Sequence, residues 1–163
     1  MSLASFALAD RNFRLRRAVE DDVGPIVELL AQDSLRAAVD SAEPERRASY
    51  VAAFHAIDAD PAHVLCVVDD ANSHVVATMQ LTFLPGLARG GATRLQIEAV
   101  RVDQGLRGAG LGSAMIRWAV AEASHRGATL VQLTSDHSRA EAHRFYERLG
   151  FTRSHAGFKM FLN

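Results

Sequence analysis

Residues 95–151 read LQIEAVRVDQGLRGAGLGSAMIRWAVAEASHRGATLVQLTSDHSRAEAHRFYERLGF. An apolar segment that ends at Val102 leads into a glycine-rich turn, residues 107–112, and an amphipathic helical pattern starts at Gly110. A strand that runs through such a turn into a helix offers backbone N–H groups and the positive end of the helix dipole to an anion. This stretch therefore predicts a strand, a phosphate-binding turn and a helix.

The spacing of the turn narrows the kind of ligand. Gly110 and Gly112 leave room for a ligand oxygen beside the backbone, and Arg107 can add a charge-assisted hydrogen bond. No Gly-Lys-Ser/Thr follows, which argues against a nucleotide P-loop. The Gly-x-Gly-x-Gly spacing and its late position in the chain argue against a dinucleotide fold. The turn therefore binds a different phosphate compound, or it is a plain strand-to-helix turn that binds no ligand.

Patterning in the rest of the chain predicts an α/β domain with a mixed sheet. Residues 1–11 are expected to be a loosely held leader, and residues 12–163 the domain. The expected strands are 13–17, 63–69, 75–84, 94–102, 130–134, 151–153 and 158–162. The expected helices are 20–30, 44–57, 110–125 and 139–149, while Ala31 to Glu43 is ambiguous. Antiparallel pairs come first and a strand–helix–strand unit comes late.

Composition excludes several classes of protein. The net charge of −1 over 163 residues gives no basic field for nucleic acid or an anionic membrane. No apolar stretch is long enough to span a membrane, and the first residues lack signal-peptide features, so we expect a cytoplasmic protein. The one cysteine, Cys66, lies in an apolar run and is expected to be a buried, inert thiol. None of the seven histidines forms a metal-binding motif, so no metal site is expected.

Two motifs carry a family resemblance. Residues 102–112, Val-Asp-Gln-Gly-Leu-Arg-Gly-Ala-Gly-Leu-Gly, fit the pattern Val-x-x-x-x-Arg-x-x-Gly-x-Gly. Residues 142–151 fit Ala-x-x-x-Tyr-x-x-x-Gly-Phe. In this order the motifs resemble those of the Gcn5-related N-acetyltransferases (GNAT), whereas residues 1–90 match only in their coarse pattern. The resemblance implies a GNAT-like fold, with a mostly antiparallel sheet of six to seven strands flanked by about four helices.

The resemblance also implies acetyl-CoA as the cosubstrate. Its pyrophosphate would lie on the helix start, and its pantetheine arm would pair with backbone of the strand 98–102 like an added strand. The implied cofactor-binding residues are Val100, Arg101, Val102, Arg107, Gly108, Ala109, Gly110, Leu111, Gly112 and Ser113. Many members carry an asparagine seven positions before the motif tyrosine. Here that position is Arg139, which could reach a phosphate instead.

Glu98 and Tyr146 are the candidate catalytic residues. A protonated amine must lose a proton before it attacks a thioester, and the thiolate leaving group must gain one. Family members often use a glutamate at the position of Glu98 as a water-mediated general base, and apolar neighbours should raise its pKa. Alternation puts Glu98 on the strand face of Gln96 and Val100, although a solvent-facing position is the alternative. The family places the tyrosine hydroxyl near the sulfur as general acid, and a core tyrosine is the alternative for Tyr146.

The resulting expectation is an acyltransferase that moves an acetyl group to a primary amine of a small molecule or peptide by direct attack in a ternary complex. The alternatives are transfer of a different acyl chain, a non-catalytic acyl-CoA-binding sensor of the same fold, and a nucleotide-binding module, for which a phosphate lysine is missing. No motif identifies the acceptor. Asp33, Asp40 and Glu43 could attract an amine or form a solvated helix face. A homodimer is possible, since dimers are the commonest assemblies.

Overall fold

The computed structural model describes residues 2–33, 40 and 43–162. Most of the ambiguous segment, residues 34–39, 41 and 42, lies outside this range. The chain divides into two compact units, residues 1–132 and 133–163. Each unit is described by itself.

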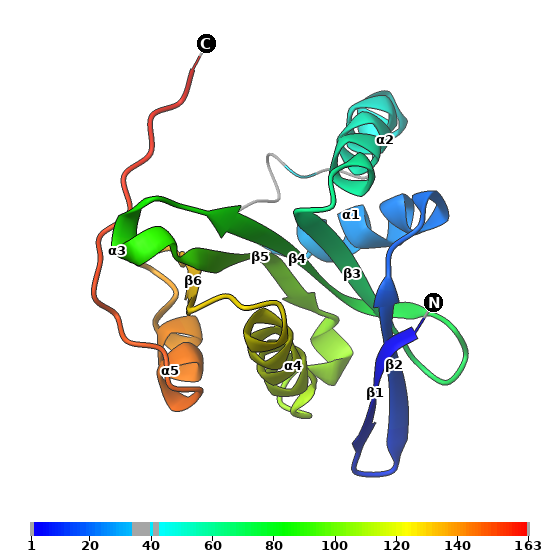
Figure 1. The fold of residues 1–163 in the computed structure, drawn as a ribbon. Helices are drawn as coiled ribbons and strands as arrows, with labels where there is room; N and C mark the ends of the chain where they lie inside the picture. Colours follow the sequence, from blue (N-terminus) through cyan, green and yellow to red (C-terminus); the bar gives the residue numbers. More distant parts are fainter. Residues whose placement is uncertain (1, 34–39, 41–42, 163) are drawn as a thin grey trace. The chain divides into compact units, whose positions relative to one another are not determined.

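A six-stranded sheet organises the first unit (Figure 1). Its strands are β1 (Ser2–Leu8), β2 (Arg11–Arg17), β3 (His63–Asp69), β4 (Val75–Pro85), β5 (Thr93–Val102) and β6 (Leu130–Leu133), in that spatial order. Neighbours from β1 to β5 are antiparallel. β6 follows β5 through a helix, the connection typical of parallel strands. The expected strands in the interior of the chain are thus confirmed.

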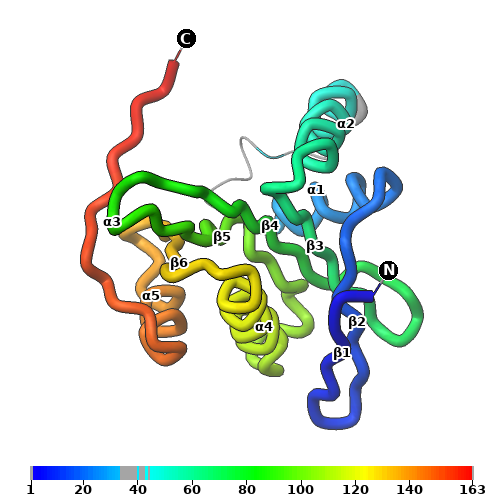
Figure 2. The backbone as a smooth tube through the Cα atoms, in the orientation of Figure 1, coloured from blue at the N-terminus to red at the C-terminus, as the bar shows by residue number. Residues whose placement is uncertain are grey.

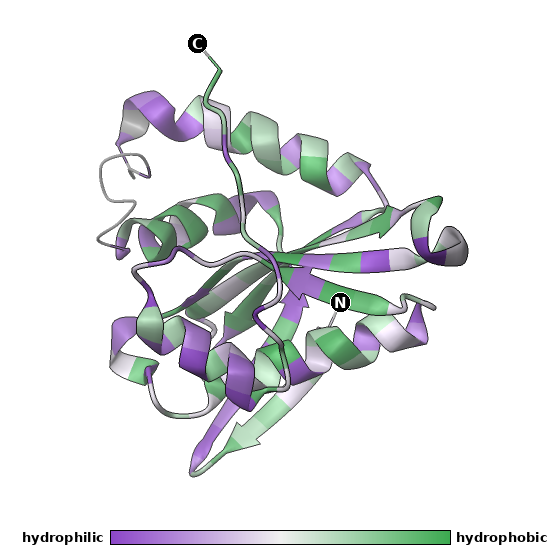
Figure 3. Cartoon of the chain, turned by 90° about the vertical axis from the view of Figure 1, so that its left-hand side faces the viewer, coloured by the Kyte–Doolittle hydropathy of each residue, from purple (hydrophilic) through white to green (hydrophobic). Residues whose placement is uncertain are grey.

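Helices cover both faces of this sheet. The helical segments of the first unit are η1 (Glu20–Asp22), α1 (Val23–Ala31), α2 (Pro44–Ala59), α3 (Ala88–Gly91), η2 (Gln104–Leu106) and α4 (Leu111–His125). Figures 1 and 3 show α1 and α2 on one face and α4 on the other, with hydrophobic stretches along the strands between them. The expected helices 20–30, 44–57 and 110–125 are confirmed.

Strand alternation divides the core into two layers. On the α1 and α2 side, Ile26, Val27 and Phe54 pack around Val67 of β3. The neighbouring positions of β3 point the other way, where Cys66 pairs in register with Met79 of β4. The residues buried there include Val64, Cys66, Met79, Leu81, Leu95, Ile97, Leu111, Met115, Ile116 and Ala119. Burial raises the pKa of the Cys66 thiol to about 12, which agrees with the inert cysteine that we expected.

The expectation of a loose leader is wrong for residues 2–8. They form β1 and pair antiparallel with β2, as the tube in Figure 2 traces. Ala9, with φ 49°, and Asp10 make the tight connection between the two strands. β2 supplies the backbone partners that this segment needs, and α4 contacts β1. The segment is therefore part of the sheet.

Two expected C-terminal strands are also wrong. No strand is assigned in residues 151–162, where we expected strands at 151–153 and 158–162. A strand exists only against a neighbour that completes its backbone hydrogen bonds, and no backbone bond is found for residues 152–162 within the described part of the chain. The side chains of Phe158, Met160, Phe161 and Leu162 are exposed. The sheet keeps six strands, within the expected range.

An arginine cluster in β2, Arg14 and Arg16, is neutralised by buried carboxylates. Arg14 Nη2 and Arg16 Nε both donate to Asp69 Oδ2 at 2.8 Å, and Arg16 also donates to both oxygens of Asp22, at 2.6 and 2.9 Å. Burial alone would raise the pKa of Asp22. Hydrogen bonds from Arg16 and from the Val19 amide outweigh this effect, so the pKa lies below its ordinary value. These pairs fasten β2 to β3 and η1 and leave little of the cluster's charge for a ligand.

The second unit contains one helix, α5 (Ala140–Arg148), among its described residues. It confirms the expected helix 139–149. Across the described residues of the whole chain, no helix is both long and apolar enough to cross a membrane.

Candidate functional site

Asp103 holds the entrance to the glycine-rich turn. Its amide donates to the Val76 carbonyl at 2.9 Å, and its Oδ1 accepts from the Gly105 amide at 2.9 Å. Its second oxygen, Oδ2, accepts from Gln32 Nε2 at 3.2 Å. The single turn η2 follows directly. These bonds fix the chain between the end of β5 and the start of α4.

Two glycines shape the turn. Gly108 and Gly110 have φ of 82° and 88°, a left-handed conformation that side chains with a Cβ rarely adopt. A Cβ at either position would meet no atom within 4 Å, so open space lies over the turn. The sequence-based expectation that ligand atoms can approach the backbone here fits this geometry.

The turn and the first turn of α4 present free N–H groups. Within the described residues, no acceptor is found for the amides of Gly108, Gly110, Leu111, Gly112 and Ser113. No acidic side chain lies in the first turn of α4, and Gly110, its N-cap, has no side chain to cap it. The exposed Arg107 adds a positive charge beside these amides. This arrangement fits a phosphate or pyrophosphate group.

β5 carries a bulge at the residue after Glu98. Ala99 has φ 52°, and the pairing with β4 shifts register there, so that Ala99 and Val100 together lie opposite Met79. Such a bulge inserts one residue and resets the alternation of side chains. Before it, Glu98 pairs with Gln80; after it, Arg101 pairs with Thr78. We expected Gln96, Glu98 and Val100 to share one face of the strand. This is wrong for Val100, because the bulge puts Arg101 on the face of Gln96 and Glu98 in its place.

Glu98 lies on the open side of β5. Leu95 and Ile97 are buried against the α4 side, so Gln96 and Glu98 point to the opposite face, and Glu98 is exposed. The apolar enclosure that we expected around this carboxylate is not found. Gln96 Oε1 accepts from Gln132 Nε2 of β6 at 2.7 Å, which makes a polar surface next to Glu98. The carboxylate is accessible for proton exchange through water.

A buried ion pair joins β5 to the end of α1. Arg101 Nη2 donates to Asp33 Oδ2 at 2.7 Å, and the two side chains are 17% and 6% exposed. Arg101 Nη1 also donates to the Val100 carbonyl at 2.7 Å, within the bulge. Asp33 is thus not part of a solvated helix face. The Arg101 guanidinium is engaged in this ion pair. Only the backbone of Arg101 is therefore left for the cofactor binding that the sequence predicts for this residue.

Removing this pair's acid should destabilise the fold. Asp33→Ala leaves the Arg101 guanidinium buried beside its bulge, and we expect a loss of about 3 kcal/mol. For a chain of this size the thermal midpoint should fall by about 6–12 °C in differential scanning calorimetry. Asp58→Ala, at an exposed position of α2, should leave the midpoint within about 2 °C. Combining Asp33→Leu with Arg101→Met should restore most of the loss, and an unchanged midpoint in Asp33→Ala would refute the structural role.

The two remaining predicted site residues, Arg139 and Tyr146, belong to the second unit. Arg139 is the N-cap of α5, and Tyr146 lies in the last turn of this helix, which ends at Arg148. The Tyr146 ring packs edge-on against Phe145 and Phe151, with centroids 5.0 and 5.8 Å away. Its side chain is half-buried. Aromatic packing of this kind holds the ring in place within the unit.

The loop before α5 is organised by Asp136. Hydrogen bonds from the hydroxyl and the amide of Ser138, at 2.7 and 2.9 Å, lower the pKa of this carboxyl. The His143 ring Nε2 lies 2.8 Å from the Asp136 carbonyl oxygen. This contact holds the His143 ring against the loop that precedes α5.

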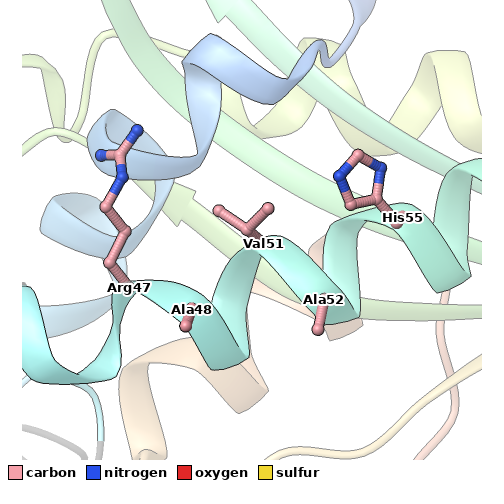
Figure 4. A pocket seen from close by; sticks show the side chains of 5 residues that line it. All are labelled: Arg47, Ala48, Val51, Ala52 and His55. Atoms are coloured by element: carbon pink, nitrogen blue, oxygen red, sulfur yellow. The ribbon is translucent and has the colours of Figure 1, made fainter.

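A separate depression lies on α2 of the first unit. Arg47, Val51 and His55 point to one side of the helix, with Ala48 and Ala52 completing the lining (Figure 4). None of the predicted site residues contributes to it. Within the described part of the chain, no group of three or more His, Cys, Asp or Glu side chains is placed to hold a metal ion.

Comparisons with known proteins fit this geometry. A model of the acetyltransferase (GNAT) family matches residues 27–151. An aminoalkylphosphonate N-acetyltransferase from Salmonella typhimurium is 40% identical over 63 residues, which span 39% of this chain and 41% of that protein. The chain thus matches less than half the length of this curated relative.

Solved structures share the fold. A Bacillus halodurans protein described as a transcriptional regulator is 40% identical, with a TM-score of 0.88 over 92% of this chain and 99% of its own. A "predicted acetyltransferase with acetyl-CoA" from Clostridium acetobutylicum is 16% identical, with a TM-score of 0.70 over 91% of this chain and 96% of its own, and it shows the fold alone. With the family model covering most of the chain, the protein belongs to the acetyltransferase (GNAT) family.

Proposed function

We propose that this protein is an acetyl-CoA-dependent N-acetyltransferase that acts on a primary amine. The observation that carries the proposal is the row of amides at residues 108 and 110–113, placed at the start of α4 and joined through η2 to the strand that carries Glu98. Family membership supports acetyl transfer in general. The activity would reside in residues 12–163, with β1 completing the edge of the sheet.

Donor binding would use the turn and the end of β5. The free amides of Gly108 and Gly110 to Ser113, with Arg107, would hold the pyrophosphate of acetyl-CoA. The backbone of Val100, Arg101 and Val102 would pair with the pantetheine arm along the edge of β5 that faces away from β4, since pairing with β4 resumes at Arg101 and Val102 after the bulge at Ala99. Bound in this way, acetyl-CoA supplies an acetyl thioester that an amine can attack.

Proton transfer would involve Glu98 and Tyr146. A primary amine has a pKa of about 10 and is protonated near neutral pH, so it must lose a proton to become a nucleophile. The exposed Glu98 carboxylate would accept this proton through a water molecule. The Tyr146 hydroxyl would donate a proton to the leaving thiolate.

A small-molecule amine is the proposed acceptor. The Salmonella relative is named for an aminoalkylphosphonate, a small amine, although the match covers only 41% of that protein. The polar surface formed by Gln96, Gln132 and Glu98 suits a hydrophilic amine more than an apolar one.

Tyr146→Phe tests the acid role. The variant keeps the ring, and with it the edge-on packing on Phe145 and Phe151, so the fold should persist. We expect kcat to fall about 10- to 100-fold while the Kd of acetyl-CoA changes less than about twofold, because the hydroxyl acts on the leaving group. Thiol release and calorimetric titration measure the two quantities. Wild-type kcat with a turned-over amine would exclude the general-acid role.

An acyl-CoA-binding sensor is the second candidate. The Bacillus halodurans structure, 40% identical over most of the chain, is described as a transcriptional regulator. A regulatory role of that protein favours a sensor as the second candidate. A sensor would bind acetyl-CoA but release no thiol with any amine.

Transfer of a longer acyl chain is a separate alternative. It is distinguished by comparing acetyl-CoA with longer acyl-CoA donors in the same assay.

A further inference from the structure

Three side chains of β5 share one face of the sheet. Leu95 and Ile97 are buried on the α4 side, so Arg94, Gln96 and Glu98 alternate onto the opposite face. Arg94 and Glu98 are both exposed. Successive members of this row are about 7 Å apart along the strand, which puts Arg94 and Glu98 about 13 Å apart at their Cα atoms.

The positions around the centre of this row are polar and uncharged. Gln80 lies directly opposite Glu98 on β4, and Thr82 lies opposite Gln96. On the other side, Gln132 of β6 donates to Gln96 at 2.7 Å. The Thr82 hydroxyl is already engaged with the His63 ring, 3.0 Å from Nδ1. The centre of the row therefore offers amide groups to a ligand and no competing charge.

Opposite charges lie at the two ends of the row. From Val75 to Val102 the chain has one acid, Glu98, and three arginines. Arg101 is paired with Asp33, which leaves Arg89, in the connection after β4, and Arg94. No ion pair or hydrogen bond to either of these two side chains is found among the described residues. The row thus runs from a positive end at Arg94 to a negative end at Glu98.

We propose that this face binds a zwitterionic acceptor, a short amine that also carries a carboxylate or phosphonate. The inference rests on the proposed function and specifies its substrate class. The ammonium group would lie beside Glu98, where the proton is removed, and the anionic group would accept charge-assisted hydrogen bonds from Arg94. Gln80, Gln96 and Gln132 would lie beside the segment that joins the two charged groups. Arg94 is thereby a specificity residue, remote from the reacting atoms.

Matched amine pairs test this inference. The probes are ω-aminoalkyl phosphonates and ω-amino acids of one to four methylenes, each compared with the amino alcohol of equal length. We expect the wild-type protein to give a KM at least about tenfold lower for the anionic member, because a charged hydrogen bond is lost in the alcohol. Arg94→Gln should raise KM about tenfold for the anionic member only, with kcat nearly unchanged, and Arg94→Lys should recover part of the loss.

A control and a binding measurement separate this inference from the proposed function. Arg11→Gln makes the same change in net charge at an exposed residue of β2, and should leave both KM values unchanged. Binding of the same amines is also followed by saturation-transfer NMR, which needs no turnover. Anion-selective binding that depends on Arg94, without acetyl transfer, would overturn the proposed function and keep this inference. Transfer or binding that is equal for both members of each pair would overturn this inference alone.

Discussion

Gly110→Val is expected to raise the Kd of acetyl-CoA about 100-fold. Gly110 has φ 88°, and valine there imposes a backbone strain that the turn can relieve only by moving the amides of residues 108 and 110–113. Each amide that leaves the phosphate loses a charge-assisted hydrogen bond, and two such losses account for the factor. The valine side chain would in addition extend into the open space over the turn. Calorimetric titration with acetyl-CoA measures the change.

Gly127→Val is the matched control for this variant. Gly127 has φ 76°, a Cβ there also meets no atom within 4 Å, and it follows the other end of α4. Both variants should therefore lose similar stability in thermal unfolding, but Gly127→Val should bind acetyl-CoA like the wild type. Equal Kd values for the two variants would show that the turn does not hold the phosphates.

Much of the fold could be predicted from local patterns. The turn from Arg107 to Gly112 is marked by glycines, of which the structure places Gly108 and Gly110 at positive φ, and α4 begins at Leu111, one residue after the expected start. The strands β3, β4 and β5 are marked by apolar runs bounded by turn residues, and their bounds differ from the expected ones by a residue or so. These features are encoded within a few neighbouring residues, which is why the sequence is informative about them.

Features that depend on distant partners were missed. Asp33 and Arg101 are 68 positions apart, and no local pattern pairs them. The same holds for Gln96 and Gln132. The bulge falls on Ala99, an alanine, which carries no sequence signal for a positive φ. Strand formation at residues 2–8, and its absence at 151–162, was decided by whether a neighbouring strand is present. One available signal was overlooked: period-two spacing puts Arg94 on the face of Glu98.

Glu98→Gln is expected to lower kcat at least about 100-fold while acetyl-CoA binding stays within about twofold of wild type. Glutamine keeps the size and the hydrogen-bonding capacity of the side chain but cannot take up the amine proton. Because Glu98 is exposed and pairs across the strand with Gln80, the substitution should cost little stability. Adding Gln80→Glu to the Glu98→Gln variant restores a carboxylate, but on the neighbouring strand. This double variant tests whether the position of the carboxylate matters as well as its charge, and it should remain inactive.

The most direct test of the account is amine-dependent release of free CoA thiol from acetyl-CoA, followed with wild-type protein and Glu98→Gln over a panel of primary amines. We predict release that requires an amine, is accompanied by the N-acetylated product in mass spectrometry, and is largely lost in Glu98→Gln although the variant still binds acetyl-CoA. Tight binding of acetyl-CoA by the wild type, with no amine-dependent release for any amine of the panel, would contradict the enzymatic account and favour the sensor.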